Sequence, residues 1–314
     1  MLNRRLIRIK VFKSLFSAVS SGADSAIGVE KSFLTSCDKT KDLYFFMMNV
    51  SVALKRAADA KIEAGLKKFH PTPEEKNPNM KFSENLFVER ILNEEKFTSY
   101  VEREGLLWNS DELLLYVKRL YARIAEKEYF KAYMASPERS FKEDCNLFIN
   151  IFTEEFEDDE TLEQILEDMS LFWMDDLGYV LMTLVANIEY LRDRDKFVIP
   201  NTFLKDDDRE FAVELMNFSL VNYHKFYDKV AENLSNWDSD RLVNTDIALI
   251  VLGVAEAVRF PNIPVKVTIN EYVEISKFYS TVNSKVFVNG LLDKMIQKML
   301  ATGEIAKSGR GLID

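Results

Sequence analysis

Residues 264–294 read PVKVTINEYVEISKFYSTVNSKVFVNGLLDK, and this stretch decides the fold. Its apolar residues recur every three or four positions, which predicts two helices separated by a short break. Pro264 suits the first turn of the earlier helix, and Asn283-Ser284 can cap the later one. The two helices predict an α-helical bundle rather than a sheet.

The helical pattern continues towards the N-terminal side of this stretch. One helix is expected over about 208–234, and another opens at Asp240 or at Asn244-Thr245. Four helices with short links predict an all-α unit over the last third of the chain. Glycine (10 residues) and proline (7 residues) are scarce in 314 residues, which also favours long helices over many short strands.

The N-terminal part of the chain is expected to be helical too. Helices are predicted over 3–20, near 26–36 and from Asp42 to about Lys68. The proline-rich stretch from His70 to Asn79 is the clearest helix breaker in the chain. We therefore expect three regions, namely an N-terminal helical region (1–69), a mostly helical insertion (70–205) and a C-terminal helical domain (206–314).

Charge is unevenly distributed along the chain. The net charge is −10, so the average field repels nucleic acid and any RNA contact requires a local basic patch. The first helix offers one, because Arg4, Arg5, Arg8 and Lys10 lie on it without an acidic neighbour. Arginine matches phosphate geometry and stacks on bases. An ordinary solvated terminus explains the cluster equally well.

The opposite charge gathers in residues 154–168, where nine acidic residues occur without a basic one. Leu162, Ile165 and Leu166 keep helical spacing within this run. The favoured interpretation is a solvated helix face beside a loop. A metal site or a site for a cationic partner is the alternative.

No constellation in the sequence predicts an enzyme or a cofactor site. The chain has two histidines, and neither forms a cluster with metal-ligand spacing. No glycine-rich phosphate loop or nucleophile motif occurs. Cys37 and Cys145 are too few to indicate a disulfide framework, and no signal peptide or membrane span is expected, so we expect a cytoplasmic protein.

The stretch 264–294 resembles the signature of the NusB family, in which an I-N-E-A-V-E-L-A-K segment is followed by K-F-V-N-G-V-L-D-K. The N-terminal basic start resembles that of the family as well, as does Leu15-Phe16 at the family's Leu-Tyr pair. Further similar positions lie upstream of the signature, at Trp237, Asp240, Arg241, Leu242, Asp246, Ala248 and Glu256. Short members of the family have no counterpart of about 70–205.

The resemblance implies an all-α fold of two small helical subdomains, without enzymatic activity. It implies binding of boxA-type single-stranded RNA together with the ribosomal protein NusE, and through both an association with the RNA polymerase elongation complex. The resemblance makes Arg5, Arg8, Phe287 and Asn289 RNA-binding candidates, and their charge adds the neighbouring Arg4, Lys10 and Lys285. The candidates for the protein partner are Phe16 and Asp246, and Gly290 is expected to allow close helix packing.

Departures from the family pattern leave other functions open. Val286 stands where the family has a lysine, Asn283 stands where it commonly has an acid, and Phe16 lacks the tyrosine hydroxyl. One alternative is a helical protein-interaction scaffold without RNA binding of its own. Another is an accessory protein for an RNA-modifying enzyme.

Overall fold

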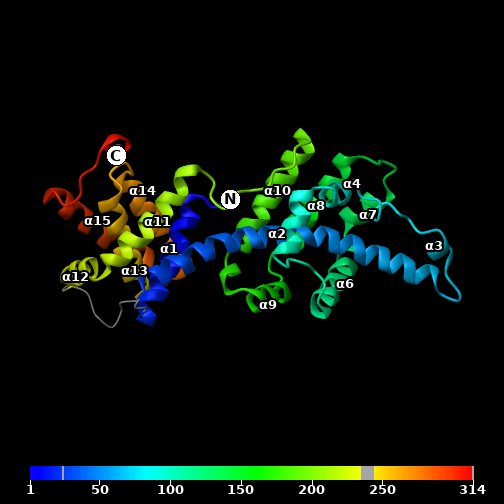
Figure 1. Cartoon of the computed structure of the whole chain (residues 1–314), viewed down its shortest axis with the longest axis horizontal. Coiled ribbons are helices and arrows are strands. Elements are labelled where there is room, and N and C mark those ends of the chain that lie inside the picture. Colours follow the sequence, from blue (N-terminus) through cyan, green and yellow to red (C-terminus); the bar gives the residue numbers. More distant parts are fainter. Residues whose placement is uncertain (23–24, 235–243, 313–314) are drawn as a thin grey trace. The chain divides into compact units, whose positions relative to one another are not determined.

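The computed structural model describes residues 1–22, 25–234 and 244–312, and Figure 1 shows its helices. Within these ranges the secondary structure is helical, and the one β-type pairing is an isolated parallel bridge between Leu2 and Phe203. The predicted all-α fold class is confirmed. Trp237, Asp240, Arg241 and Leu242 lie outside the described residues.

The chain divides into two compact units. The terminal unit consists of residues 2–37 and 203–312, so it is built from both ends of the described chain. The central unit consists of Met1 and residues 38–202. Residues 38–69 therefore pack with the expected insertion and not with the N-terminal region. The boundaries of the two compact units differ from those of the three expected regions.

The terminal unit is arranged around α13 (Asn244–Arg259), which contacts α1, α11, α12, α14 and α15. Every residue of α13 from Asp246 to Ala257 is buried, as expected of a helix covered on all sides. The start of α2 (Ala26–Leu66) also belongs to this unit. The other helices are α1 (Arg4–Ser21), α11 (Asp206–Val221), α12 (Tyr223–Asn233), α14 (Val265–Tyr279), α15 (Ser284–Ala301) and the 3-10 turn η3 (Gly309–Leu312).

The central unit is arranged around the middle of α2, where all residues from Asp42 to Leu54 are buried. Trp108 stacks on Phe46 with ring centroids 4.3 Å apart, and its indole N–H donates to the carbonyl oxygen of Phe46. The surrounding helices are α3 (Pro73–Lys76), α4 (Leu86–Leu92), α5 (Glu95–Arg103), α6 (Asp111–Ala125), α7 (Glu128–Ala135), α8 (Phe141–Glu154), α9 (Glu160–Met169), η1 (Leu171–Trp173) and α10 (Leu177–Arg194).

Two helix boundaries differ from the prediction. The segments near 26–36 and 42–68 form one continuous helix, α2, because Thr40 bonds to Asp176 and Lys39 pairs with Asp42 where a break was expected. The expected helix over 208–234 is instead split at Asn222. The Asn222 backbone departs from helical geometry there (φ −100°, ψ 9°), and both its N–H and its side-chain amide donate to the Phe218 carbonyl, at 3.1 and 2.9 Å.

The close packing expected at Gly290 occurs at Gly253 instead. A Cβ atom on Gly290 would meet no atom within 4 Å, so this position is open. A Cβ atom on Gly253 would lie 2.8 Å from Leu292 Cδ2 and 3.1 Å from Tyr272 Cδ2. The expectation for Gly290 is therefore wrong, and α13 approaches α14 and α15 through Gly253.

Candidate nucleic-acid and partner interface

The basic residues at the start of α1 face carboxylates from other helices of the terminal unit. The Asn3 side chain caps α1 by accepting a bond from the Leu6 amide. Arg4 donates to Asp207 at 2.8 Å and to Asp208 at 3.1 Å, and both acids lie in the first turn of α11. Arg4 is therefore partly neutralised.

Arg5 is the most exposed of the three arginines, with 52 % of its side chain accessible. Its guanidinium forms two bonds to Glu271 on α14, at 2.9 and 2.8 Å. The hydrogen bond to Glu271 raises the pKa of Arg5, and the same bond lowers the pKa of Glu271 against the opposing effect of burial. Arg5 thus carries an accessible positive charge, but an internal carboxylate already occupies its fork.

Arg8 is buried, and its guanidinium donates two bonds to Glu256 on α13, at 2.7 and 2.8 Å. Glu256 also accepts from the hydroxyl groups of Thr268 and Tyr272 on α14, each at 2.9 Å. Burial works to lower the pKa of Arg8, but the Glu256 charge and hydrogen bonds outweigh it and raise that pKa. The arrangement joins three helices and leaves Arg8 inaccessible to solvent.

Two further candidates on α1 are at least partly covered. Lys10 is buried, with 5 % of the residue exposed. Phe16 is partly buried against the core, with its ring centroid 6.0 Å from that of Phe12. The Phe12 ring in turn lies 5.7 Å from that of Tyr279 at the end of α14.

Asp246, the other candidate for the protein partner, is buried near the start of α13. Its Oδ2 accepts a bond from Ser284 at 2.7 Å, which links α13 to the first residue of α15. Its Oδ1 has no hydrogen-bond partner among the described residues. Asp246 therefore organises the α14–α15 turn, where Ser284 also bonds to Ser280 and Thr281.

The remaining candidates cluster at this turn. Lys285 and Asn289 are exposed, and Phe287 is partly buried against the core. Apolar side chains next to them face solvent, with exposures of 81 % for Phe278 and 70 % for Val286. We call Phe278, Val282, Lys285, Val286 and Asn289 the α14–α15 surface; Gly290 adjoins it.

Phe278 was not among the residues singled out from the sequence. The inward face of α14 is centred on Tyr272, and Phe278, six residues further along, lies about 120° around the helix from it. The sequence signal that could have identified Phe278 is a large aromatic residue that lies outside the apolar stripe of its helix. An exposed aromatic ring is suited to stacking on a base.

The candidates do not all come together in one place. Contacts between α1 and α14 advance in the same direction along both helices, from Arg5–Glu271 to Phe12–Tyr279. The two contacts are eight residues apart on α14, or about 12 Å at the helical rise. Glu271 lies at the middle of α14 (Val265–Tyr279), so Arg5 faces the middle of this helix, and the α14–α15 surface begins at its C-terminal end.

Comparison with known proteins agrees with this helical arrangement. A model of the NusB family matches residues 182–297. The transcription antitermination protein NusB of Salinibacter ruber is 31 % identical over 138 residues, which are 43 % of this chain and 86 % of that protein. The chain belongs to the NusB family.

Other NusB relatives match shorter segments. The transcription antitermination protein NusB of Chloroherpeton thalassium is 35 % identical over 120 residues, 38 % of this chain and 57 % of that relative's length. The NusB protein of Geotalea daltonii is 36 % identical over 89 residues, 28 % of this chain and 61 % of that protein. No solved structure matches the chain.

The described part of this NusB-family chain shows neither a metal centre nor a membrane helix. Among those residues, no group of histidine, cysteine and acidic side chains is arranged to hold a metal ion. None of the described helices is both long and apolar enough to span a bilayer.

Proposed function

We propose that this NusB-family chain is a transcription antitermination factor that binds boxA-type single-stranded RNA together with NusE. Through these two ligands it would join the RNA polymerase elongation complex. The observation that carries the proposal is the α14–α15 surface, where Phe278, Lys285 and Asn289 are exposed on the family's signature helices. These side chains offer an aromatic face, a cation and an amide, as single-stranded RNA recognition requires.

The structure of α1 narrows the set of RNA candidates. Arg8 and Lys10 are buried, so we assign them to the support of the fold and not to direct phosphate contacts. Arg5 stays a candidate, because phosphate can compete with Glu271 at the surface. If Arg5 and Lys285 each neutralise one phosphate, the log–log dependence of affinity on salt has a slope of about −1.4 on single strands.

One observation favours the scaffold alternative. Arg4, Arg5 and Arg8 are all engaged by carboxylates, so the basic start of α1 presents little unpaired positive charge. A protein with a net charge of −10 also repels RNA at long range. On this alternative the chain binds its protein partner and leaves the RNA to that partner.

Fluorescence anisotropy with a short boxA-like RNA separates the two functions. The RNA is titrated with the full chain, alone and with NusE from the same source, and with an Arg5→Gln/Lys285→Gln variant. Loss of two phosphate contacts lowers affinity and flattens the salt slope by about 1.4. Tighter RNA binding in the presence of NusE and its loss in the variant support the proposal.

The matched control is Lys225→Gln/Lys298→Gln, which removes the same charge from exposed positions on α12 and on the far end of α15. This control should bind RNA as the wild type does. NusE binding without any RNA binding would replace the proposal by the scaffold function. An equal loss of RNA affinity in the test variant and in the control would mean that only the net charge of the protein matters.

A further inference from the structure

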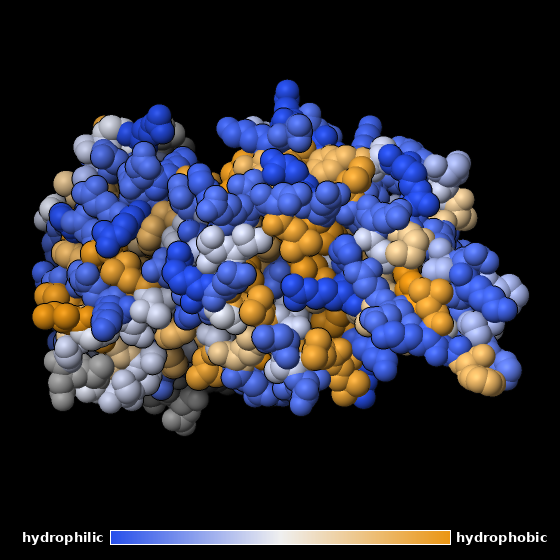
Figure 2. All heavy atoms as spheres, turned by 45° about the vertical axis from the view of Figure 1, so that its right-hand side comes forward, coloured by the Kyte–Doolittle hydropathy of each residue, from blue (hydrophilic) through white to orange (hydrophobic). Residues whose placement is uncertain are grey.

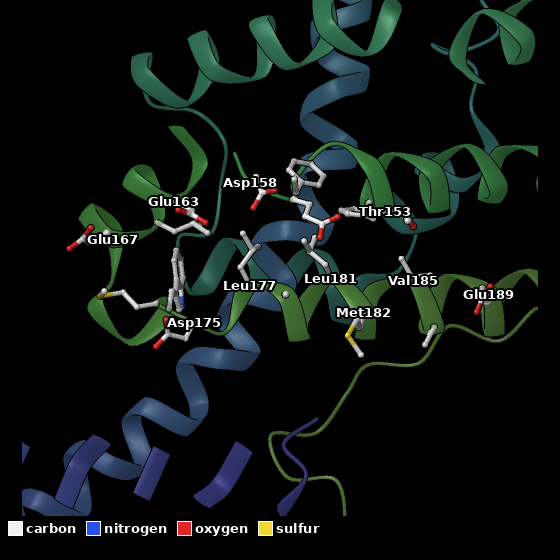
Figure 3. A pocket seen from close by; sticks show the side chains of 18 residues that line it. Thr153, Asp158, Glu163, Glu167, Asp175, Leu177, Leu181, Met182, Val185 and Glu189 are labelled. Atoms are coloured by element: carbon white, nitrogen blue, oxygen red, sulfur yellow. The ribbon is translucent and has the colours of Figure 1, made fainter. Parts of the chain in front are cut away.

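The central unit contains a hollow of about 850 Å³ between the end of α8, α9, η1 and α10. We call it the α8–α10 groove. Figure 3 shows Leu177, Leu181 and Val185 in sequence along α10 on the apolar side of the groove. The spacing of four residues puts these side chains in one row on the helix surface.

The groove exposes two large methionine side chains to solvent. Met182 is 71 % exposed and Met174 is 44 % exposed, and both line the groove. Figure 2 shows that apolar side chains interrupt the hydrophilic surface on the face drawn there. Flexible methionine side chains suit a surface that binds a helix through its apolar face.

The rim of the groove is acidic. Six carboxylates line it, and no lysine or arginine does so; the acids are Glu157, Asp158, Glu163, Glu167, Asp175 and Glu189. Glu163 and Glu167 extend from successive turns of α9 in Figure 3. Neither forms an ion pair within the described part of the chain, although Glu155 and Asp159 of the same acidic run pair with Arg123.

The acids of the 154–168 run therefore divide into two groups. Glu155 and Asp159 are buried and hold α6 against the start of α9 through Arg123. Glu163 and Glu167 are exposed and line the groove together with its apolar side chains. A solvated helix face accounts for exposed acids but not for the apolar hollow next to them.

We propose that the α8–α10 groove binds a basic amphipathic helix of a protein partner. Along α10 the groove extends from Leu177 to Glu189, about 18 Å, which matches a partner helix of about three turns; the apolar row from Leu177 to Val185 covers about 12 Å of it. The partner's apolar face would pack on this row, and its lysines or arginines would meet the acidic rim. Phosphate backbones are excluded because the rim repels them.

The test uses the full chain without RNA and two fluorescein-labelled peptides of about 14 residues. The first has leucines at positions i, i+3, i+4 and i+7 and lysines at the polar positions. The second has glutamate in place of every lysine. We expect the lysine peptide to bind, and the glutamate peptide to bind at least about tenfold more weakly in anisotropy titrations.

Two variants test the location of binding. Glu163→Lys/Glu167→Lys reverses the charge of the rim, and Met182→Lys puts a charge into the groove at an exposed position. Each variant should bind the lysine peptide with an affinity at least about tenfold lower than that of the wild type. The matched control, Glu84→Lys/Glu102→Lys, makes the same charge change at exposed acids that do not line the groove, and should stay within about twofold of wild type.

Three results would overturn the proposal. The lysine peptide could fail to bind the wild type, or the control could lose as much affinity as the rim variant, which would indicate non-specific attraction. Sedimentation could also show a dimer that Met182→Lys abolishes, in which case a second copy of this chain covers the groove.

Discussion

Arg8 on α1 and Glu256 on α13 form a two-bond ion pair that is shielded from solvent, with 4 % and 0 % of their side chains exposed. Thr268 and Tyr272 donate to the same carboxylate, so both of its oxygens are satisfied. A buried pair of this kind is costly to desolvate and strongly destabilising when only one member is removed. It fixes α1 against the centre of the terminal unit.

Arg8→Met should lower the free energy of unfolding by about 3–5 kcal/mol, because Glu256 keeps its charge in a buried site without a cation. The double variant Arg8→Met/Glu256→Gln should recover part of this loss. A neutral amide still accepts from Thr268 and Tyr272 but costs less to bury. Urea unfolding followed by circular dichroism measures both variants.

Arg5→Met is the control for this pair, because Arg5 forms the same fork at the surface. Exposed ion pairs contribute about 0–1 kcal/mol, so its effect should be small. If Arg8→Met costs no more than Arg5→Met, the buried pair does not support the fold as argued.

Gly253→Ala and Gly290→Ala should change stability in opposite directions. The new methyl group at Gly253 meets the packed side chains of Leu292 and Tyr272, so we expect a loss of about 1–3 kcal/mol. At Gly290 the methyl group meets open space in the middle of α15, so we expect a gain of about 0.5–1 kcal/mol from helix propensity.

The same urea experiment checks the glycine pair, with each variant serving as the control for the other. A destabilised Gly290→Ala variant would restore the packing role expected from the sequence. RNA binding by the folded Gly290→Ala variant tests separately whether RNA contacts the backbone at Gly290.

The signature stretch 264–294 was sufficient to predict α14 and the start of α15, because helical periodicity is local in sequence. The role of Arg8 was not predictable in this way. Its partner Glu256 lies 248 residues away, and only tertiary packing brings the two together. The sequence alone therefore does not tell whether a basic residue on such a helix forms a buried ion pair or contacts a ligand; its burial decides this.

Local signals failed for the same reason at two other positions. Cys37 to Lys41 have a polar, loop-like composition, yet bonds from distant residues such as Asp176 keep α2 continuous there. Gly253 carries no sequence signal that separates it from Gly290. Close helix approach is a property of the neighbouring helix, here Leu292 on α15.

Glu271→Gln should make the terminal unit less dependent on pH under acidic conditions. The hydrogen bond from Arg5 lowers the pKa of Glu271, so its contribution is fully present above the unfolded pKa of about 4.3 and is lost as pH falls through the lower folded pKa. The stability difference between wild type and variant should therefore be largest near neutral pH and disappear on acidification.

Urea midpoints at several pH values below neutrality measure this difference. Glu210→Gln is the control, because Glu210 is an exposed acid on α11 that forms no ion pair in the described part of the chain. A difference for Glu271→Gln that stays constant down to acidic pH would mean that the Arg5–Glu271 pair is not coupled to folding.

Phe278→Ala should weaken RNA binding without weakening the fold. The ring is 81 % exposed, so its removal costs little packing, whereas an aromatic platform contributes about 1–3 kcal/mol per stacked base. Stacking does not neutralise phosphate, so the salt slope of the variant should equal that of wild type even though its affinity is about tenfold lower. This separates Phe278 from Lys285, whose loss should change both affinity and slope.

Val221→Ala is the matched control, since Val221 is 77 % exposed on α11, away from the α14–α15 surface. It should leave RNA affinity unchanged in the same anisotropy titration with NusE present. If Phe278→Ala binds RNA as wild type does while Lys285→Gln is impaired, the surface acts by charge alone. In that case we would assign the Phe278 ring to a contact with a protein partner, because an exposed ring contributes little to the stability of the isolated chain.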